Sequence, residues 1–192
     1  MHLNLRLKRK KALVVFTVYL PKNSGLERFN YLALREFYER EVRFFQEPGE
    51  NISRLVSENG GYGWTGNDLF CEYQLSGRNL ARIYRFVPWP ETIKPKLCLL
   101  GPEEKSIKTV LGDGLRIAAP SKYQNLIREY LQQKNIDLNL TYLDGQVERQ
   151  IRKKQADLAF DIVYSGKTMR EEGLAIYDTI FEDSGLVLLT KD

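Results

Sequence analysis

The sequence predicts an α/β fold in which strands and helices alternate along the chain. Runs rich in β-branched and aromatic residues, such as residues 12–20, are followed by turn residues and then by apolar residues at helical spacing. The stretch 156–164 is apolar apart from two aspartates, which is typical of a strand buried on both faces of a parallel sheet. With 192 residues, 43% of them hydrophobic and 28% charged, the chain can bury the core of one domain or of two small lobes.

The first half of the chain contains strand and helix pairs that turn residues separate. The strand at 12–20 ends at Pro21, and a turn leads into a helix over 26–40 with one apolar face. The elements expected next are a strand at 42–46, a helix at 52–58 capped by Asn51, and a strand from 62 that runs through a glycine loop into another helix. Three prolines within 86–95 predict a lobe boundary or a loop excursion.

The second half continues this alternation. Strands are expected at 96–100, 115–119, 138–143, 156–164 and 186–189. Helices are expected at 122–134, 146–154 and 169–180. The repeated order of strand, loop and helix supports the α/β assignment for the whole chain.

The net charge of +4 comes from one N-terminal cluster. The chain has 29 basic and 25 acidic side chains, and residues 6–11 hold five of the basic ones. Without them the balance is 24 to 25, so we expect no basic face for nucleic acid and interpret residues 1–11 as a solvated extension. The apolar run 12–20 is too short to cross a bilayer, and no small-x-small cleavage site follows it. We therefore expect a cytoplasmic protein with no membrane partner.

Histidine and cysteine are too scarce for several kinds of chemistry. The only histidine is His2, which excludes Ser-His-Asp catalysis, Cys-His catalysis and a histidine-rich metal site. The two cysteines, Cys71 and Cys98, lie 27 residues apart without metal-ligand spacing. We interpret them as free thiols in a reducing compartment.

A loop at the end of the strand at 156–164 is the best candidate for chemistry. Ser165-Gly166-Lys167-Thr168 opens a helix, and Thr168 with Glu171 fits a capping box. The backbone N–H groups of this loop would form an anion site, to which Lys167 and Arg170 add positive charge. Phosphate is the commonest occupant of such a site, and the alternative is an ordinary capped helix with exposed bases.

Asp161 bears on two further interpretations. A nucleotide P-loop needs glycine five residues before Gly166, where Asp161 stands, so we reject that motif. Asp157 and Asp161 lie four residues apart on one strand and so point to the same face. Because a carboxylate in an apolar strand is costly unless it is paired, each needs a partner: a backbone donor, a base, or a sugar hydroxyl with Mg²⁺.

Five patches of the chain resemble the ATP phosphoribosyltransferase family, the first enzyme of histidine biosynthesis. One patch follows the family signature A-D-x-I-V-D-x-V-x-T-G-x-T-L-R-x-N-G-L, with these residues in register: Asp157, Asp161, Val163, Ser165, Gly166, Thr168, Arg170, Gly173 and Leu174. Residues 116–126 are similar to R-I-A-T-K-Y-P-N-L with two extra residues, and 143–148 to L-x-G-x-V-E. Residues 63–69 are similar to G-I-T-G-x-D-L, and 20–22 to the start of L-P-K-G-R-L.

The resemblance implies two α/β lobes like those of a type II periplasmic binding protein, with the active site in the cleft between them. Lobe I would comprise residues 1–99 and 180–192, and lobe II, which would bind phosphoribosyl pyrophosphate, residues 100–179. The implied reaction transfers phosphoribosyl to N1 of ATP and releases pyrophosphate with the help of Mg²⁺. The implied catalytic residues are Lys22, Lys122 and Asp161, the last at the ribose hydroxyls. The implied substrate-binding residues are Thr65, Gly66, Asp68, Glu148, Asp157, Ser165, Gly166, Lys167, Thr168 and Arg170.

The first lobe departs from the family pattern. The arginine of K-G-R-L is missing from 22–26, and R-P-R-D is replaced by Glu47-Pro48-Gly49-Glu50, which exchanges positive for negative charge. Two alternatives therefore stay open: a diverged family member that binds a phosphorylated ligand or a partner protein without catalysis, and an unrelated two-lobe binding protein. The extent of the chain resembles the family's short form, which implies a regulatory subunit related to histidyl-tRNA synthetase. We also expect a homo-oligomer, a dimer or larger.

Overall fold

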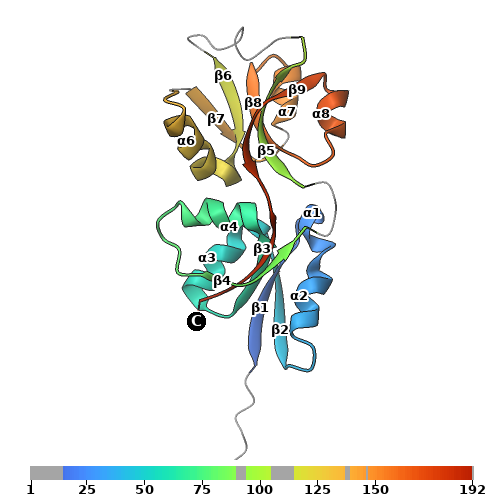
Figure 1. Cartoon of the computed structure of the whole chain (residues 1–192), viewed down its shortest axis with the longest axis vertical. Helices are drawn as coiled ribbons and strands as arrows, with labels where there is room; N and C mark the ends of the chain where they lie inside the picture. The colour runs from blue at the N-terminus through green and yellow to red at the C-terminus, as the bar shows by residue number, and fades with distance from the viewer. Residues whose placement is uncertain (1–14, 90–93, 105–114, 137–138, 146, 192) are drawn as a thin grey trace, which may run out of the picture.

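The computed structural model describes residues 15–89, 94–104, 115–136, 139–145 and 147–191, so the extension at 1–11 lies outside the described residues. The chain forms two lobes, and each lobe is built on one five-stranded sheet with helices packed against it (Figure 1). This arrangement confirms the predicted two-lobe α/β fold. No helix in the described ranges is both long enough and apolar enough to cross a membrane.

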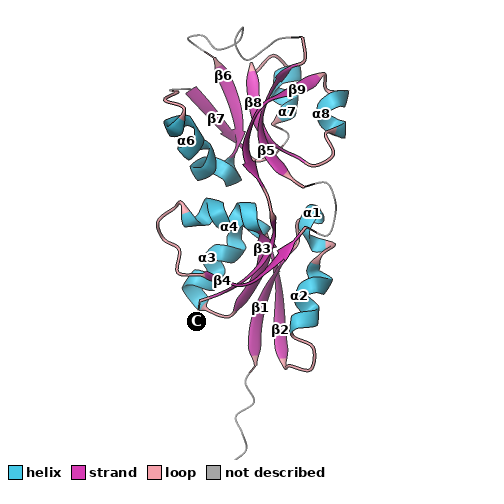
Figure 2. Cartoon of the chain, viewed as in Figure 1, coloured by secondary structure: helices cyan, strands magenta, loops and turns pink. Residues whose placement is uncertain are grey.

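Lobe I is built on the sheet with strand order β2-β1-β3-β10-β4. Its strands are β1 (Phe16–Pro21), β2 (Val42–Glu47), β3 (Tyr62–Gly66), β4 (Arg82–Pro88) and β10 (Gly185–Thr190). β1 runs parallel to β2 and β3, whereas β10 runs antiparallel to β3 and β4. The helices are α1 (Ser24–Glu27), α2 (Asn30–Glu36), α3 (Gly49–Asn59) and α4 (Asn67–Gln74). α1 and α2 lie on one side of the strands, and α3 and α4 lie on the other (Figure 2).

Successive residues of β1 show how both faces of this sheet are covered. Val18 belongs to the same core cluster as Phe29, between α1 and α2. Tyr19 belongs to a second cluster with Ile52 and Val56 of α3. Because neighbouring side chains of a strand point to opposite faces, one continuous apolar run supplies both cores.

The helix predicted over 26–40 is wrong in its extent, because the structure has two short helices that end at Glu36. Phe29, between them, packs against Trp89 with 5.3 Å between the ring centroids. The side-chain amide of Asn30 donates a hydrogen bond to the Pro21 carbonyl (3.1 Å). These tertiary contacts interrupt a helix that apolar spacing alone predicts as continuous.

Lobe II is built on the sheet with strand order β7-β6-β8-β5-β9. Its strands are β5 (Lys96–Pro102), β6 (Arg116–Pro120), β7 (Asn139–Leu143), β8 (Leu158–Val163) and β9 (Leu174–Glu182). β6 runs parallel to β7 and β8, and β5 runs antiparallel to β8 and β9. The helices are η1 (Ser121–Tyr123, 3₁₀), α6 (Gln124–Gln133), α7 (Glu148–Arg152) and α8 (Lys167–Glu171). The strands predicted in this half are confirmed to within two residues at each end.

The helix predicted over 169–180 is wrong beyond residue 171. Gly173, with φ +66°, follows α8, and the chain then continues as β9 in the sheet. Ile176, Thr179 and Ile180 are β-branched, which favours a strand, and β9 pairs with β5 along most of its length.

Two chain segments cross between the lobes. β5 and β9 lie in the second sheet, so the crossings fall between Pro88 and Lys96 and between Glu182 and Gly185, and not at 99–100 and 179–180. The Asp183 N–H donates to the Pro95 carbonyl (2.9 Å), which ties the two crossings together. After the second crossing, β10 runs back through the lobe I sheet (Figure 1).

Candidate functional site

The lobes enclose a cleft with a cavity of about 690 Å³. Its walls come from both lobes and from the second crossing: Asn23, Ser24, Gly25, Leu26, Arg28, Asp68, Leu69, Trp89, Lys122, Tyr123, Tyr164, Ser165 and Asp183. The lobes approach closely here, since a methyl group placed on Gly25 would lie 3.1 Å from the Tyr164 hydroxyl. Of the residues predicted as functional, Asp68, Lys122 and Ser165 line this cleft.

The predicted phosphate loop lies at the edge of the cleft, where β8 leads into α8. Gly166 has φ +70°, a left-handed conformation that glycine adopts readily. The Arg170 guanidinium donates to the Ser165 carbonyl (3.0 Å), and the Lys167 N–H donates to the Ser165 hydroxyl (3.4 Å). A second cavity of about 240 Å³ follows the loop and is lined by Leu100 and residues 161–169. Arg170 thus stabilises the loop through the Ser165 carbonyl.

The predicted capping box is wrong. α8 begins at Lys167 with Gly166 as its N-cap, and no side chain caps it. The Glu171 carboxylate instead lies 3.8 Å from the Lys167 ammonium, and the two form an ion pair between residues one helical turn apart. The helix begins two residues earlier than the capping pattern predicts, so Thr168 lies inside the first turn.

The three residues predicted as catalytic lie in different surroundings. Asp161, on β8, lines the loop cavity and accepts a hydrogen bond from the Ile162 N–H (2.7 Å). Lys122 is exposed on η1 and lines the interlobe cleft. Lys22 follows β1 and is exposed, and its N–H donates to the Glu47 carbonyl (2.9 Å). Lys22 is not among the residues that line either cavity.

Two buried carboxyl groups lie side by side in the wall of the cleft. A methyl group placed on Gly66 would lie 2.3 Å from Asp68 Oδ1 and 3.6 Å from Asp183 Oδ2. The Tyr123 hydroxyl, from lobe II, donates to Asp68 Oδ2 (2.5 Å), and the Gly185 N–H donates to Asp183 Oδ1 (3.1 Å). Asp183 Oδ2 has no hydrogen-bond partner of normal geometry among the described residues.

Burial holds protons on this acid pair. It raises the pKa of the Asp68 carboxyl, although the hydrogen bond from Tyr123 acts in the opposite direction. Burial, together with the nearby charge of Asp68, raises the pKa of Asp183 to about 8. The pair therefore retains a proton at neutral pH. Sequence reasoning missed Asp183; the signal was an acidic residue directly before the apolar run 185–189.

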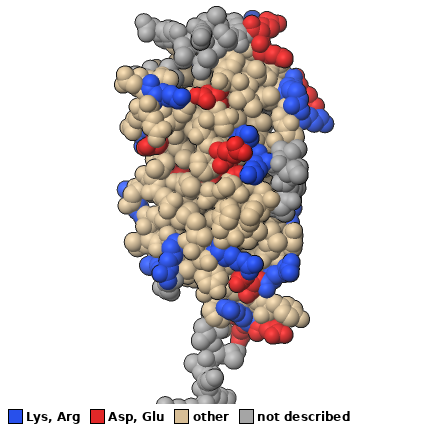
Figure 3. Space-filling view, viewed as in Figure 1, with Lys and Arg blue, Asp and Glu red and all other residues tan. Residues whose placement is uncertain are grey.

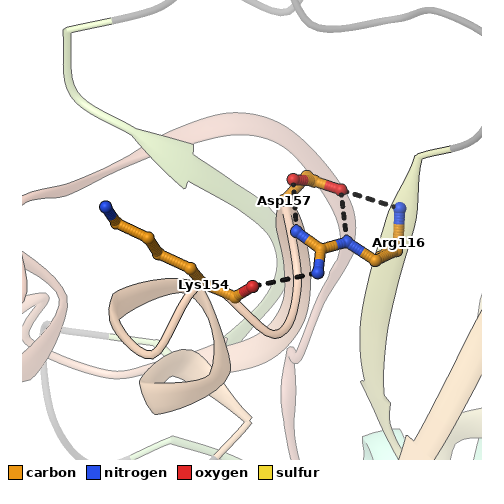
Figure 4. Close-up of polar contacts among 3 residues, drawn as sticks. All are labelled: Arg116, Lys154 and Asp157. Carbon is orange, nitrogen blue, oxygen red and sulfur yellow. Dashed lines mark hydrogen bonds and ion pairs between the residues drawn. The ribbon is translucent and has the colours of Figure 1, made fainter.

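Neither cavity is lined by four of the predicted substrate-binding residues, Thr65, Gly66, Glu148 and Asp157. Thr65 is fully buried, and its hydroxyl donates to the Gly49 carbonyl (3.0 Å). Gly66 is buried beside the acid pair, and Glu148 is the first residue of α7. Asp157 binds Arg116 through two side-chain hydrogen bonds of 3.0 and 3.1 Å (Figure 4).

Asp157 therefore has the partner that the sequence left open, a base. It also accepts a hydrogen bond from the Arg116 N–H (3.0 Å), and the Arg116 guanidinium donates to the Lys154 carbonyl (2.9 Å) (Figure 4). Because β8 begins just after Asp157 and ends before Ser165, the structure places Asp157 at the opposite end of the strand from the loop.

Lobe I contributes one cationic side chain, Arg28, to the lining of the cleft. The Asn23 side chain accepts a hydrogen bond from the Gly49 N–H (2.5 Å) and donates one to Glu50 (3.3 Å). The residues that depart from the family pattern thus contact one another. On the face shown in Figure 3, basic and acidic side chains are interspersed.

Two α/β lobes joined by two crossings, with a glycine loop at the cleft, define a two-lobe fold like that of the type II periplasmic binding proteins. Within that class, residues 49–192 match the profile of the family described as ATP phosphoribosyltransferase. The chain belongs to the ATP phosphoribosyltransferase family.

Curated relatives and solved structures agree with this. The chain is 30% identical over 146 residues to the ATP phosphoribosyltransferase of Sulfurisphaera tokodaii, covering 74% of this chain and 48% of that protein. It is 34% identical over 98 residues to that of Pyrococcus furiosus, covering 51% and 47%. The chain spans about half the length of these relatives.

Two solved structures share the fold. A chain of the ATP phosphoribosyl transferase (HisG:HisZ) complex from Thermotoga maritima has a TM-score of 0.72 and 23% identity, covering 92% of this chain and 87% of that one. The periplasmic aliphatic sulphonate binding protein SsuA from Escherichia coli has a TM-score of 0.61 and 17% identity, covering 92% and 65%.

Proposed function

We propose that this chain catalyses the transfer of phosphoribosyl from phosphoribosyl pyrophosphate to N1 of ATP. The bond between ribose C1 and the pyrophosphate oxygen breaks, a bond from C1 to N1 of adenine forms, and pyrophosphate leaves. The observation that carries the proposal is the loop 165–168, which adjoins the cleft and lies in the best-matched family patch. No covalent nucleophile is needed, so a chain with one histidine can perform this reaction by positioning and charge stabilisation.

The roles follow from the surroundings of each residue. The backbone N–H groups of 165–168 would bind the 5′-phosphate, with Lys167 and Arg170 adding charge. Asp161, on the wall of the loop cavity, would accept hydrogen bonds from the ribose hydroxyls. Lys122 would stabilise the charge that develops on the leaving pyrophosphate from across the cleft. The cleft volume of about 690 Å³ is in the range of small-molecule sites and suits a nucleotide beside the phosphoribosyl group.

Magnesium is implied by the family, and the donor set fits an ion bound mainly through phosphate oxygens. Among the described residues, no group of three acidic, histidine or cysteine side chains could hold a metal ion. Asp161 is the one carboxylate that lines the loop cavity, and Mg²⁺ usually binds through one or two carboxylates together with substrate phosphates. When bound, the ion would neutralise charge on the leaving pyrophosphate.

We further propose that the chain works in the cytoplasm as a homo-oligomer with a regulatory subunit related to histidyl-tRNA synthetase. The support is the similar fold of a chain in the Thermotoga maritima HisG:HisZ complex. Cys71 and Cys98 are free thiols, which suits a reducing compartment.

Pyrophosphate release tests the proposed reaction. We expect release that requires ATP, phosphoribosyl pyrophosphate and Mg²⁺ together, and that a regulatory subunit increases. Lys122→Ala should lower kcat by about 100-fold if this ammonium stabilises the leaving group, the usual scale for one electrostatic donor. No release with the subunit supplied would exclude catalysis by this chain.

A second candidate function is that of a diverged member that binds a phosphorylated ligand without catalysing the transfer. It is favoured by the segment 47–50, where Glu47 and Gly49 stand in place of the arginines of R-P-R-D and Glu50 contacts Asn23. On this reading phosphoribosyl pyrophosphate would still stabilise the protein against heat, and pyrophosphate release would be absent.

A further inference from the structure

One face of α4, a helix of lobe I, contacts lobe II. Asp68 and Glu72 lie four residues apart on this helix, so their side chains share one face. Both bind the same short segment of lobe II, the 3₁₀ turn η1 and the start of α6. Figure 1 shows α4 at the top of lobe I, facing α6 across the junction of the lobes.

Glu72 makes the larger share of these contacts. Its Oε1 accepts hydrogen bonds from the Asn125 backbone N–H (2.8 Å) and from the Asn125 side-chain amide (2.8 Å). Its Oε2 accepts a hydrogen bond from the Leu126 N–H (2.8 Å). Hydrogen bonds to an ionised carboxylate are roughly twice as strong as bonds between neutral groups. Half-buried between the lobes, Glu72 binds lobe II with both of its oxygens.

The N-terminus of α6 depends on this carboxylate. α6 has no side-chain cap of its own; its N-cap position is Tyr123, whose hydroxyl is bound to Asp68. The first N–H groups of a helix need acceptors, and a negative charge there is favourable to the helix dipole. Glu72 therefore caps the N-terminus of α6 from the other lobe, in the way that an N-cap side chain caps its own helix.

The same segment carries Lys122 into the cleft. Lys122 lies in η1, directly before Tyr123. It is three residues before Asn125, the first residue whose backbone N–H group Glu72 binds. If α4 released this segment, η1 could move with lobe II, and the distance from Lys122 to the lobe I wall of the cleft would no longer be fixed.

We propose that Glu72 is a positioning residue that clamps lobe II to lobe I and thereby holds Lys122 over the cleft. The clamp itself is independent of the reaction, whereas its effect on ligand binding rests on the proposed function. Asp68 adds a second contact between the lobes through Tyr123. The two crossings, tied together by the hydrogen bond from the Asp183 N–H to the Pro95 carbonyl, also connect the lobes.

Two variants and a matched control test the clamp. Glu72→Ala removes both acceptor oxygens, whereas Glu72→Gln keeps one neutral acceptor and should recover part of the effect. The control is Glu129→Gln on α6, because Glu129 is exposed and accepts a hydrogen bond from Gln133 of its own helix (2.9 Å). Circular dichroism first establishes that each variant is folded.

The first measurement needs no ligand. Hydrogen exchange of the Asn125 and Leu126 amides should be at least about tenfold faster in Glu72→Ala, because these N–H groups lose their acceptors. Small-angle X-ray scattering of the free protein should show a larger radius of gyration for Glu72→Ala, a smaller increase for Glu72→Gln, and none for Glu129→Gln. Unchanged exchange and unchanged scattering in Glu72→Ala would overturn the clamp.

The second measurement is the affinity for phosphoribosyl pyrophosphate by calorimetry. If the lobes of Glu72→Ala are correctly placed for about a tenth of the time, the apparent Kd rises about tenfold. A more open molecule with an unchanged Kd would overturn the positioning of Lys122. Failure of the unmodified chain to bind phosphoribosyl pyrophosphate would contradict the proposed function, and the ligand-free measurements would still decide the clamp.

Discussion

At the scale of single residues, the acid pair makes stability depend on pH. The pKa of Asp183 is about 8 in the folded chain, against 3.8 for an ordinary aspartate. Below 3.8 both folded and unfolded chains hold the proton; between the two values only the unfolded chain releases it, which favours unfolding. The stabilising contribution of the protonated group is therefore complete below about 3.8 and lost as the pH rises through about 8.

Asp183→Asn should remove this dependence, because the amide keeps the acceptor for the Gly185 N–H and cannot lose a proton. We expect the melting temperature of the variant, relative to the unmodified chain, to rise by roughly 5 °C or more between pH 5 and pH 9. Thermal melts across that range measure it. Asp144→Asn, at an exposed turn, is the control, and an equal offset at every pH in Asp183→Asn would contradict the assignment.

Asp157, just before β8, and Asp161, within β8, show where prediction from single residues stops. The sequence indicates that Asp157 and Asp161 each need a partner and leaves open which kind. Asp157 is bound by Arg116, 41 residues earlier in the chain, whereas Asp161 accepts the N–H of its neighbour Ile162 and faces a cavity. The difference arises from which strand lies beside each residue, and local pattern does not contain that information.

At the scale of elements, the loop between β8 and α8 depends on the left-handed backbone of Gly166. A non-glycine residue in this conformation costs about 1–2 kcal/mol. A Cβ at this position would also lie 3.0 Å from Arg170 Nη1, so it would press on the guanidinium that braces Ser165. Gly166→Ala should therefore weaken both folding and anion binding.

Gly145→Ala separates these two effects. Gly145 has φ +87°, and a Cβ there would meet no atom of the described residues within 4 Å, so it carries a comparable backbone cost without contact with the loop. Both variants should melt lower by roughly 2–8 °C. In calorimetry, only Gly166→Ala should raise the Kd for phosphoribosyl pyrophosphate, and an equal Kd in the two variants would remove the loop from the binding site.

Prediction of elements succeeded where pairing and periodicity agree. The apolar stretch 156–164 is β8 because a run buried on both faces fits only a central strand of a covered sheet. The sequence predicts residues 174–180 as the second part of a helix, but they lie in β9, because pairing with β5 overrides a spacing that suits either element. The capping box failed for a related reason: the turn at Gly166 starts α8 two residues earlier.

At the scale of the whole molecule, the alternation of strands and helices predicts the α/β class, and the resemblance implies the two lobes. The position of the crossings could not be read from the sequence. The strand at 96–102 looks like a continuation of lobe I until its pairing with 174–182 places both in lobe II. Contacts between distant segments thus decide which lobe a strand belongs to, and they also create the clamp of Glu72 on α6.

The division of charge between the lobes predicts which substrate binds alone. Lobe II contributes Lys122 to the cleft and Lys167 and Arg170 to the loop, whereas lobe I contributes Arg28 alone and has Glu50 bound to Asn23 nearby. Phosphoribosyl pyrophosphate would have its phosphates mostly on the lobe II side, and the triphosphate of ATP would meet a lobe I wall with one cation, Arg28. With Mg²⁺ present, phosphoribosyl pyrophosphate alone should therefore raise the melting temperature more than ATP alone at equal concentration.

A ligand at about 100 times its Kd stabilises the folded chain by about 2.7 kcal/mol, which corresponds to roughly 5–10 °C for a chain of this size. Ribose 5-phosphate is the control, because it offers the 5′-phosphate without pyrophosphate and should give a smaller shift than phosphoribosyl pyrophosphate. Without Mg²⁺, which the proposed reaction requires, the two substrates together should raise the melting temperature beyond either alone, since one occupied lobe wall favours the closed arrangement that the other needs. A larger shift with ATP alone would mean that lobe I supplies phosphate contacts other than the arginines it lacks, and that the charge argument assigns the substrates to the wrong walls of the cleft.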